Sequence, residues 1–152
     1  MNVEPYLFFN GRCEEALQYY ARALDARITA KIRYAESPTP PTQALPPGWS
    51  NKLMHANLQV GATTLMASDG TQAGGTQFGG FALTLSLPDE DTARRYFDNL
   101  AAGGKVRMAL ARTFWSPLFG MVTDRFGLDW MVSVFRPQDS DLARQTMGGQ
   151  TT

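Results

Sequence analysis

His55 is the side chain of this protein best suited to chemistry, because it is the single histidine and lies among polar neighbours. The segment 52–60 alternates as a half-buried strand does, which places His55 on one face with Leu53, Asn57 and Gln59. An imidazole can act as a general base, hydrogen-bond a ligand or bind a metal. A histidine that only ties two strands together would show the same pattern. The sequence therefore makes His55 a candidate for catalysis and ligand binding, with a structural role as the alternative.

Two other patterns are better explained by structure than by chemistry. Cys13 starts an expected helix, where the helix dipole could lower a thiol pKa, but it falls on the apolar stripe of that helix. The glycines of 70–80 lack the Lys-Ser/Thr pair of a phosphate-binding loop and the strand-to-helix setting of a dinucleotide-binding loop. We expect a buried thiol in the first case and a flexible linker in the second.

The composition is that of an ordinary globular chain. It has 152 residues, 43% of them hydrophobic, which is enough for one packed domain. Fourteen basic and fourteen acidic side chains cancel, which argues against nucleic acid or an anionic membrane as a partner. One cysteine allows no internal disulfide, the first residues do not form a signal sequence, and no stretch approaches about 18 apolar residues. We therefore expect a cytoplasmic protein without a membrane span.

Alternation and helical spacing predict the elements that would position His55. Between 26–35 and 52–60, five prolines in 38–47 exclude a helix or a central strand, so an irregular loop is expected. The sequence leaves open whether this loop covers a pocket or a dimer interface. Helices are expected at 12–24 and 89–102, with Asp89 as an N-cap and Gly103 as a stop. Strands are expected at 3–9, 26–35, 52–60, 63–68, 81–87, 105–112, 119–125 and 128–135.

Two stretches of the chain look like one structural unit written twice. Each is an apolar strand, a turn and an acidic-starting helix with an aromatic pair, although coincidence is the alternative. Both halves read β-α-β-β-β, which predicts an α+β fold. We expect one domain over 1–137, with modules at 3–69 and 81–135, a linker at 70–80 and a polar tail at 138–152. An offset of 77 residues aligns four pairs, which are Gly11 with Pro88, Ala16 with Ala93, Tyr19 with Tyr96 and Tyr20 with Phe97.

Three segments, PYLFFNGRCEEALQYYARALDA, LMHANLQVGATTLMASDG and TFWSPLFGMVTDRFGLDWMVSV, carry a resemblance to a known family. They resemble the PhnB-like branch of the vicinal oxygen chelate superfamily, which contains glyoxalase I, bleomycin-resistance proteins and extradiol dioxygenases. The resemblance covers roughly residues 3–135. It implies two βαβββ modules forming a cupped mixed sheet that holds a ligand, and a homodimer.

The resemblance also implies where a metal would lie. Metal-dependent members place one ligand on the first and one on the last strand of each module. Those positions offer no suitable donor for a divalent cation, so we expect no metal and no other cofactor. A rearranged metal site around His55, with Asp69 or Glu4, is the alternative. The vacated positions are Pro5, Met66, Ala82 and Met131.

We expect a protein that binds a small apolar or aromatic molecule in the cup between the modules, and not an enzyme. The alternatives are a metal-dependent lyase or dioxygenase and a non-catalytic dimeric scaffold. A methyltransferase, a name given to related sequences, is not expected, because no glycine-rich loop follows a strand to hold its cofactor. Flat aromatic rings and flexible methionines suit such a ligand, although the same residues could form the core. The expected ligand-binding residues are Tyr6, His55, Met66, Phe114, Trp115, Trp130 and Ser133.

Overall fold

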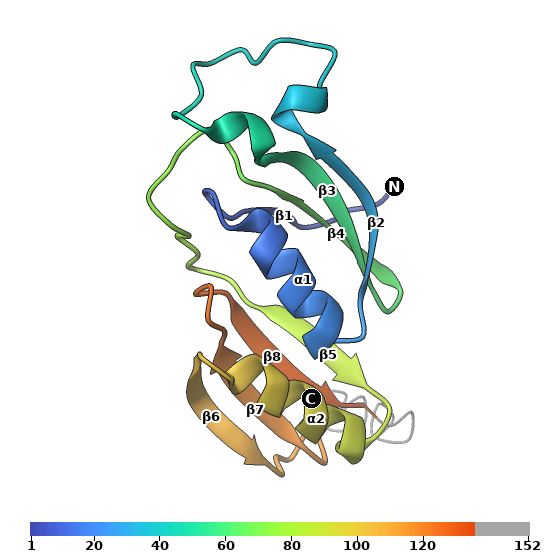
Figure 1. The fold of residues 1–152 in the computed structure, drawn as a ribbon. Coiled ribbons are helices and arrows are strands. Elements are labelled where there is room, and N and C mark those ends of the chain that lie inside the picture. Colours follow the sequence, from blue (N-terminus) through green and yellow to red (C-terminus); the bar gives the residue numbers. More distant parts are fainter. Residues whose placement is uncertain (136–152) are drawn as a thin grey trace, which may run out of the picture. The chain divides into compact units, whose positions relative to one another are not determined.

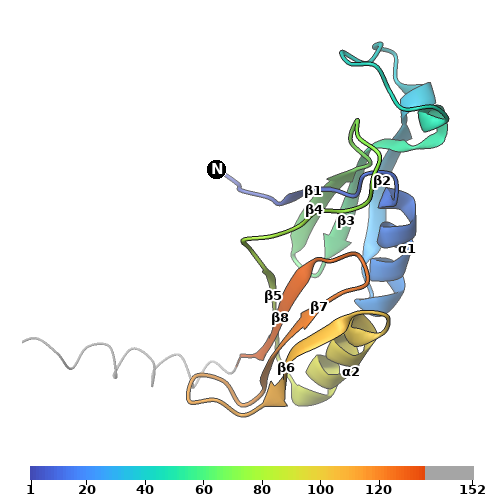
Figure 2. The same cartoon turned by 90° about the vertical axis from the view of Figure 1, so that its left-hand side faces the viewer.

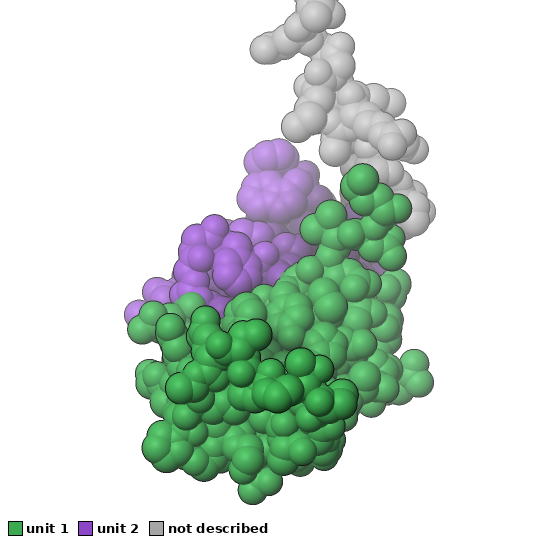
Figure 3. All heavy atoms as spheres, turned by 90° about the horizontal axis from the view of Figure 1, so that it is seen from above, with its two compact units in different colours: residues 1–77 green, residues 78–152 purple. Residues whose placement is uncertain are grey.

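The computed structural model describes residues 1–135, which form eight strands and two α-helices (Figures 1 and 2). The chain divides into two compact units, one of residues 1–77 and one that starts at residue 78 (Figure 3). The division falls inside the segment predicted as a linker, 70–80. The predicted polar tail, 138–152, lies outside the described residues.

The first unit is a four-stranded sheet with one helix. The sheet order is β1-β4-β3-β2, in which β1 runs parallel to β4 and the other pairs are antiparallel. Two short 3₁₀ helices, Tyr34–Glu36 and Trp49–Asn51, flank the proline-rich loop, as expected for an irregular segment. The elements are β1 (Tyr6–Phe8), α1 (Cys13–Ala23), β2 (Arg27–Arg33), β3 (Leu53–Val60) and β4 (Thr63–Ser68).

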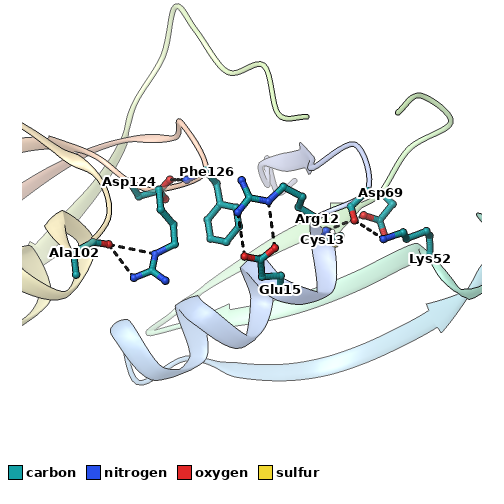
Figure 4. A network of polar contacts seen from close by, with 10 residues as sticks. Arg12, Cys13, Glu15, Lys52, Asp69, Ala102, Asp124 and Phe126 are labelled. Carbon is teal, nitrogen blue, oxygen red and sulfur yellow. Dashed lines mark hydrogen bonds and ion pairs between the residues drawn. The ribbon is translucent and has the colours of Figure 1, made fainter. Parts of the chain in front are cut away.

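A distant carboxylate holds the start of α1. Asp69 is 1% exposed, and its two oxygens accept hydrogen bonds from the backbone N–H groups of Cys13 at 2.8 Å and Leu53 at 2.7 Å (Figure 4). The residue before the helix, Arg12, provides no side-chain cap. Asp69 therefore satisfies an otherwise unpaired N–H of the helix and fixes the start of β3 at the same time.

The second unit repeats this topology in the order β5-β8-β7-β6, with β5 parallel to β8. Asp89 caps the helix as predicted, because its side chain accepts from the backbone N–H of Thr92 at 2.7 Å. Gly103, with φ +76°, follows the end of the helix. The predicted α+β fold of two βαβββ modules is confirmed. The elements are β5 (Leu83–Leu87), α2 (Glu90–Ala101), β6 (Lys105–Ala111), β7 (Phe119–Thr123) and β8 (Asp129–Val134).

Each sheet turns one face toward its own helix, and we call the opposite face the far face. Side chains alternate between the two faces along each strand. In the first sheet the helix face is buried and comprises Leu7, Ala56, Leu58, Leu65 and Ala67. The far face carries Tyr6, Phe8, His55, Asn57 and Met66.

A bulge between β2 and β3 makes one predicted face assignment wrong. Ile32 pairs with His55 but Arg33 pairs with Leu53, so Met54 is an additional residue on β3. Leu53 is consequently 0% exposed in the core instead of sharing the face of His55. Regular alternation cannot anticipate such a bulge.

The predicted offset of 77 residues aligns the helices but not the first strands. Leu7 is a buried core residue, whereas Thr84, its counterpart at that offset, is exposed, and half-buried Leu85 takes the position on the helix face. Between matched strand and helix positions the chain of the first unit is one residue longer, since Cys13 lies five residues after Phe8 but Glu90 lies four residues after Ser86. Asn10 and Gly11, in the turn before α1, both have positive φ. The strands therefore match at an offset of 78.

This shift changes the predicted metal positions. Pro5 has the pleat phase of buried Leu7, whereas Ala82 has the phase of exposed Thr84, which is the opposite one. Glu4, not Pro5, is thus the counterpart of Ala82.

Candidate functional site

The far face of the first sheet gathers three of the predicted ligand-binding residues. Tyr6 on β1 pairs with Met66 on β4, which pairs in turn with Asn57 on β3. His55 lies two residues before Asn57 on the same side of the strand. The sheet register thus brings Tyr6, His55 and Met66 together from segments that are about 50 residues apart in the sequence.

A chain of hydrogen bonds joins the polar groups of this face. Tyr6 Oη lies 2.8 Å from His55 Nδ1, and His55 Nε2 lies 2.9 Å from Asn57 Oδ1. With the amide oxygen of Asn57 as the acceptor, a neutral imidazole has its hydrogen on Nε2. Nδ1 then has a free lone pair, to which Tyr6 donates its phenol hydrogen. We call this chain the Tyr6–His55–Asn57 relay.

Tyr6 is a neutral phenol under ordinary conditions. Burial raises the pKa of Tyr6 above its usual value, and the nearby Cys13 and Tyr34 raise it further. The same side chain remains 39% exposed. Tyr6 therefore keeps its proton while presenting its oxygen to a ligand.

A groove of about 440 Å³ opens beside the relay, within the size range of small-molecule sites. Tyr6 and Phe8 stack in it with ring centroids 5.1 Å apart, and Phe8 is 53% exposed. Among the described residues, no charged side chain lines the groove. Its lining residues are Tyr6, Phe8, Asn10, Tyr34, Met54, Ser68, Gly70, Thr71 and Gln72.

Both ends of the proline-rich loop are tied to the groove wall. The carbonyl oxygen of Gly70 accepts hydrogen bonds from Tyr34 Oη and from Trp49 Nε1, each at 2.7 Å. Within the loop, Gln43 Oε1 accepts from Thr71 Oγ1 at 3.2 Å. The loop is therefore joined to two residues of the groove wall, and this supports a role at the pocket.

The side chains of the alternative metal site around His55 are already engaged in hydrogen bonds. Asp69 uses both carboxylate oxygens on backbone N–H groups, and both ring nitrogens of His55 have partners within the relay. Cys13 is buried, and burial together with the charge of Asp69 raises its thiol pKa. Within residues 1–135, no group of three or more His, Cys, Asp or Glu side chains could hold a metal. The positions carried over from the family, Pro5, Met66, Ala82 and Met131, offer only alkyl and thioether groups, and Glu4, the counterpart of Ala82, is the one carboxylate that the corrected register adds.

In the second unit, Trp130 is a core residue and not a ligand-facing one. It is 2% exposed, and its indole N–H donates to Asp124 Oδ2 at 2.9 Å. Asp124 also accepts from the backbone N–H groups of Phe126 and Leu128, and Figure 4 shows the first of these contacts. Trp130 precedes Met131 directly, so the two side chains must lie on opposite faces of β8.

The other predicted ligand-binding residues of the second unit, Phe114, Trp115 and Ser133, have contacts within that unit. Phe114 is 94% exposed and packs edge-on against Trp115, with ring centroids 4.7 Å apart. Trp115 packs edge-on against Phe119 in turn, with ring centroids 5.4 Å apart. Ser133 Oγ donates to Ser116 Oγ at 3.1 Å. That these residues share one pocket with Tyr6 and His55 stays a prediction.

Sequence reasoning missed Phe8, Tyr34, Met54 and Ser68 as groove residues. Phe8 could have been found, since it alternates in phase with Tyr6. Met54 could not, because only the bulge in β3 turns it toward the groove.

Comparison with known proteins agrees with this fold. Residues 3–132 match the model of the Glyoxalase/Bleomycin resistance protein/Dioxygenase superfamily. Protein YjdN of Escherichia coli (strain K12) is 38% identical over 144 residues, which cover 91% of this chain and 98% of YjdN.

Solved structures show the same fold. Protein PA1353 from Pseudomonas aeruginosa is 41% identical with a TM-score of 0.77, over 88% of this chain and 97% of that one. A PhnB protein from Bacillus cereus, described as a 3-demethylubiquinone-9 3-methyltransferase, is 24% identical with a TM-score of 0.74, over 89% of this chain and 100% of its own. The chain belongs to the Glyoxalase/Bleomycin resistance protein/Dioxygenase superfamily.

Neither helix in the described part of the chain is long and apolar enough to cross a membrane.

Proposed function

We propose that this protein binds a small, flat, mainly apolar molecule in the groove of the first unit, without the metal centre of its superfamily. The observation that carries the proposal is the Tyr6–His55–Asn57 relay beside an uncharged groove in which a stacked aromatic pair is half exposed. Stacked rings favour a planar partner, and a few polar points fix its orientation.

A thermal-shift titration with naphthol as a planar probe tests this proposal. A ligand that binds only the folded protein raises the melting temperature in proportion to the logarithm of its concentration over Kd. Phe8→Ala should weaken the binding of naphthol by about tenfold, since it removes the exposed stacking surface. Phe135 is equally exposed, at 53%, and does not line the groove, so Phe135→Ala is the matched control.

Two results would contradict the proposal. The absence of any shift with naphthol, at concentrations up to its solubility, would argue for a scaffold role. Equal weakening by Phe8→Ala and Phe135→Ala would show that the probe binds elsewhere.

Metal analysis separates this proposal from a metal-dependent lyase or dioxygenase. We expect less than stoichiometric metal in protein purified without chelators, because the donors of His55 and Asp69 are already engaged. A stoichiometric divalent metal that is lost in His55→Ala would overturn the proposal.

Homodimerisation, which the family resemblance implies, belongs to the same proposal. Support comes from β6, which lies at the edge of its sheet and exposes Val106 by 46% and Met108 by 40%. The mass of one chain is 16.8 kDa, and light scattering over a concentration series should give twice that mass. A constant monomer mass would contradict a dimer.

A further inference from the structure

We infer that the groove of the first unit selects uncharged planar molecules that donate a hydrogen bond, such as phenols and N–H heteroaromatics, over molecules that only accept one. The inference rests on the proposed function and specifies the ligand class of the same site. Three features of the groove support it: its hydroxyl groups donate their hydrogens within the protein, His55 has its hydrogen on Nε2, and no charged side chain is in the described lining.

The hydroxyl groups of the groove donate their hydrogens to the protein itself. Tyr34 donates to the Gly70 carbonyl at 2.7 Å, and Thr71 donates to Gln43 at 3.2 Å. Ser68 Oγ donates to the Leu53 carbonyl at 3.4 Å. Each hydroxyl has one hydrogen but two lone pairs, so these groups offer a ligand acceptor capacity, although Ser68 Oγ already accepts from the Gly70 N–H at 2.9 Å. The side-chain donors in the lining are the amides of Asn10, which gives one hydrogen to the Gly75 carbonyl, and Gln72.

The relay likewise makes Tyr6 a hydrogen-bond acceptor toward a ligand. Asn57 Oδ1 sets the hydrogen of His55 on Nε2, and His55 Nδ1 then takes the hydrogen of Tyr6. Tyr6, but neither His55 nor Asn57, lines the groove. The relay therefore makes the Tyr6 oxygen an acceptor toward the groove, where it also has a hydrogen bond with the Ser68 side chain, and Asn57 is the positioning residue of the relay.

The lining of the groove argues against an ionised ligand. Within the described residues no charged side chain lines it, so a bound carboxylate or ammonium would lose water without gaining an ion pair. A neutral donor loses less on entering the groove, and it can use the lone pairs that the hydroxyl groups retain.

Histidine ring NMR tests the polarity of the relay directly. The chain has one histidine, so ¹⁵N-labelled histidine gives a single pair of ring nitrogen signals. The Nε2–H form is expected in the folded protein at neutral pH. An Nδ1–H form would overturn the inference, since Tyr6 would then be free to donate to a ligand.

Calorimetric titration with matched probes tests the ligand class. Naphthol should bind about three- to tenfold more tightly than methoxynaphthalene, which cannot donate, and naphthoate should bind most weakly. Tyr6→Phe should remove much of the preference for naphthol while leaving methoxynaphthalene nearly unchanged. Tyr96→Phe, outside the groove, should leave the preference intact.

The possible outcomes separate the inference from the proposed function. If naphthol and methoxynaphthalene bind equally, or if acetylnaphthalene binds more tightly than naphthol, the inference fails while the groove remains a binding site. If none of the probes binds, the proposed function fails, and the inference fails with it.

Discussion

The far faces of the two sheets carry different chemistry on the same topology. In the first unit the far face holds a phenol, an imidazole and an amide within hydrogen-bond distance of one another. In the second unit the corresponding face holds thioether and hydroxyl groups and, at one end, the Asp129 carboxylate. Thr123 Oγ1 donates to Asp129 Oδ1 and accepts from Arg107 Nε at 2.9 Å. The helix faces, by contrast, are apolar in both units. The core of the duplicated module is thus compatible with different far faces, which carry a neutral relay of phenol, imidazole and amide in the first unit and a network with a guanidinium and a carboxylate in the second.

The two units also differ in how a buried carboxylate joins their elements. Asp69 accepts two backbone N–H groups and so links α1 to β3. Asp124 accepts two backbone N–H groups and an indole N–H around the turn before β8. One carboxylate therefore connects elements distant in sequence, and the other closes a local hairpin.

The largest expected effect concerns these carboxylates. Asp124→Ala should destabilise the protein by about 3–5 kcal/mol, and Asp69→Ala by about 2–4 kcal/mol, because buried N–H groups lose their acceptors. Urea unfolding followed by circular dichroism measures both. A loss below about 1 kcal/mol for either variant would mean that water replaces the carboxylate, and the contrast between two and three donors would have no energetic meaning.

A second prediction compares the polar groups of the two far faces. His55→Gln should weaken naphthol binding by about three- to tenfold, because Tyr6 loses its ordered acceptor. Ser133→Ala should change that binding by less than about twofold if the site lies in the first unit alone. Isothermal calorimetry of both variants makes the comparison, with unfolding curves to confirm that each variant is folded. An equal loss in the two variants would show that both far faces contribute to the site.

The smallest expected effect is on acid stability and concerns the first unit. Glu14 hydrogen-bonds Arg33 at 2.8 Å and Lys31 at 3.0 Å, and these bonds lower its pKa from 4.5 to about 2. A lowered pKa in the folded state contributes stability that is fully present above the unfolded value, near 4.5, and is lost as the pH falls toward about 2.

Glu14→Gln should therefore cost about 1 kcal/mol at neutral pH, a small value because the carboxylate is 34% exposed. It should also flatten the fall in stability between pH 4.5 and pH 2. Urea unfolding at several pH values measures the slope. Glu90→Gln, on the first turn of α2, is the matched control, since Glu90 lies 3.8 Å from Arg94 in an exposed pair. Equal slopes in the two variants would contradict a special role for Glu14.

Local sequence patterns were sufficient to predict the helices and strands. Strict alternation located β3 and β4 to within a residue, and the acidic residue at Asp89 located the start of α2. The limits of these elements depend on residues that are neighbours along the chain, so each segment can be predicted from its own sequence. The gathering of Tyr6 with His55 came from the family resemblance, and the register of the sheet confirms it.

Features that depend on partners far along the chain could not be predicted. At the bulge the N–H of Leu53 is bound by Asp69, which lies 16 residues later in the sequence. Trp130 was grouped with Met131 by residue type, although adjacent strand residues cannot share a face. The additional residue in the turn at Asn10 and Gly11 moved β1 by one position against β5. Each error came from a single-residue change in phase, to which pleated strands are especially sensitive.

Trp49 gives the first unit an optical reporter. Its indole rests on Gly11, where an added Cβ would approach the ring to 3.1 Å, and its N–H holds the Gly70 carbonyl of the groove wall. Indole emission depends on the hydrogen bond and polarity around the ring, so occupancy of the groove should shift the fluorescence of this one residue. Replacing Trp115 and Trp130 by phenylalanine would leave Trp49 as the sole tryptophan, and excitation selective for indole could then follow binding without labelling the protein or its ligand.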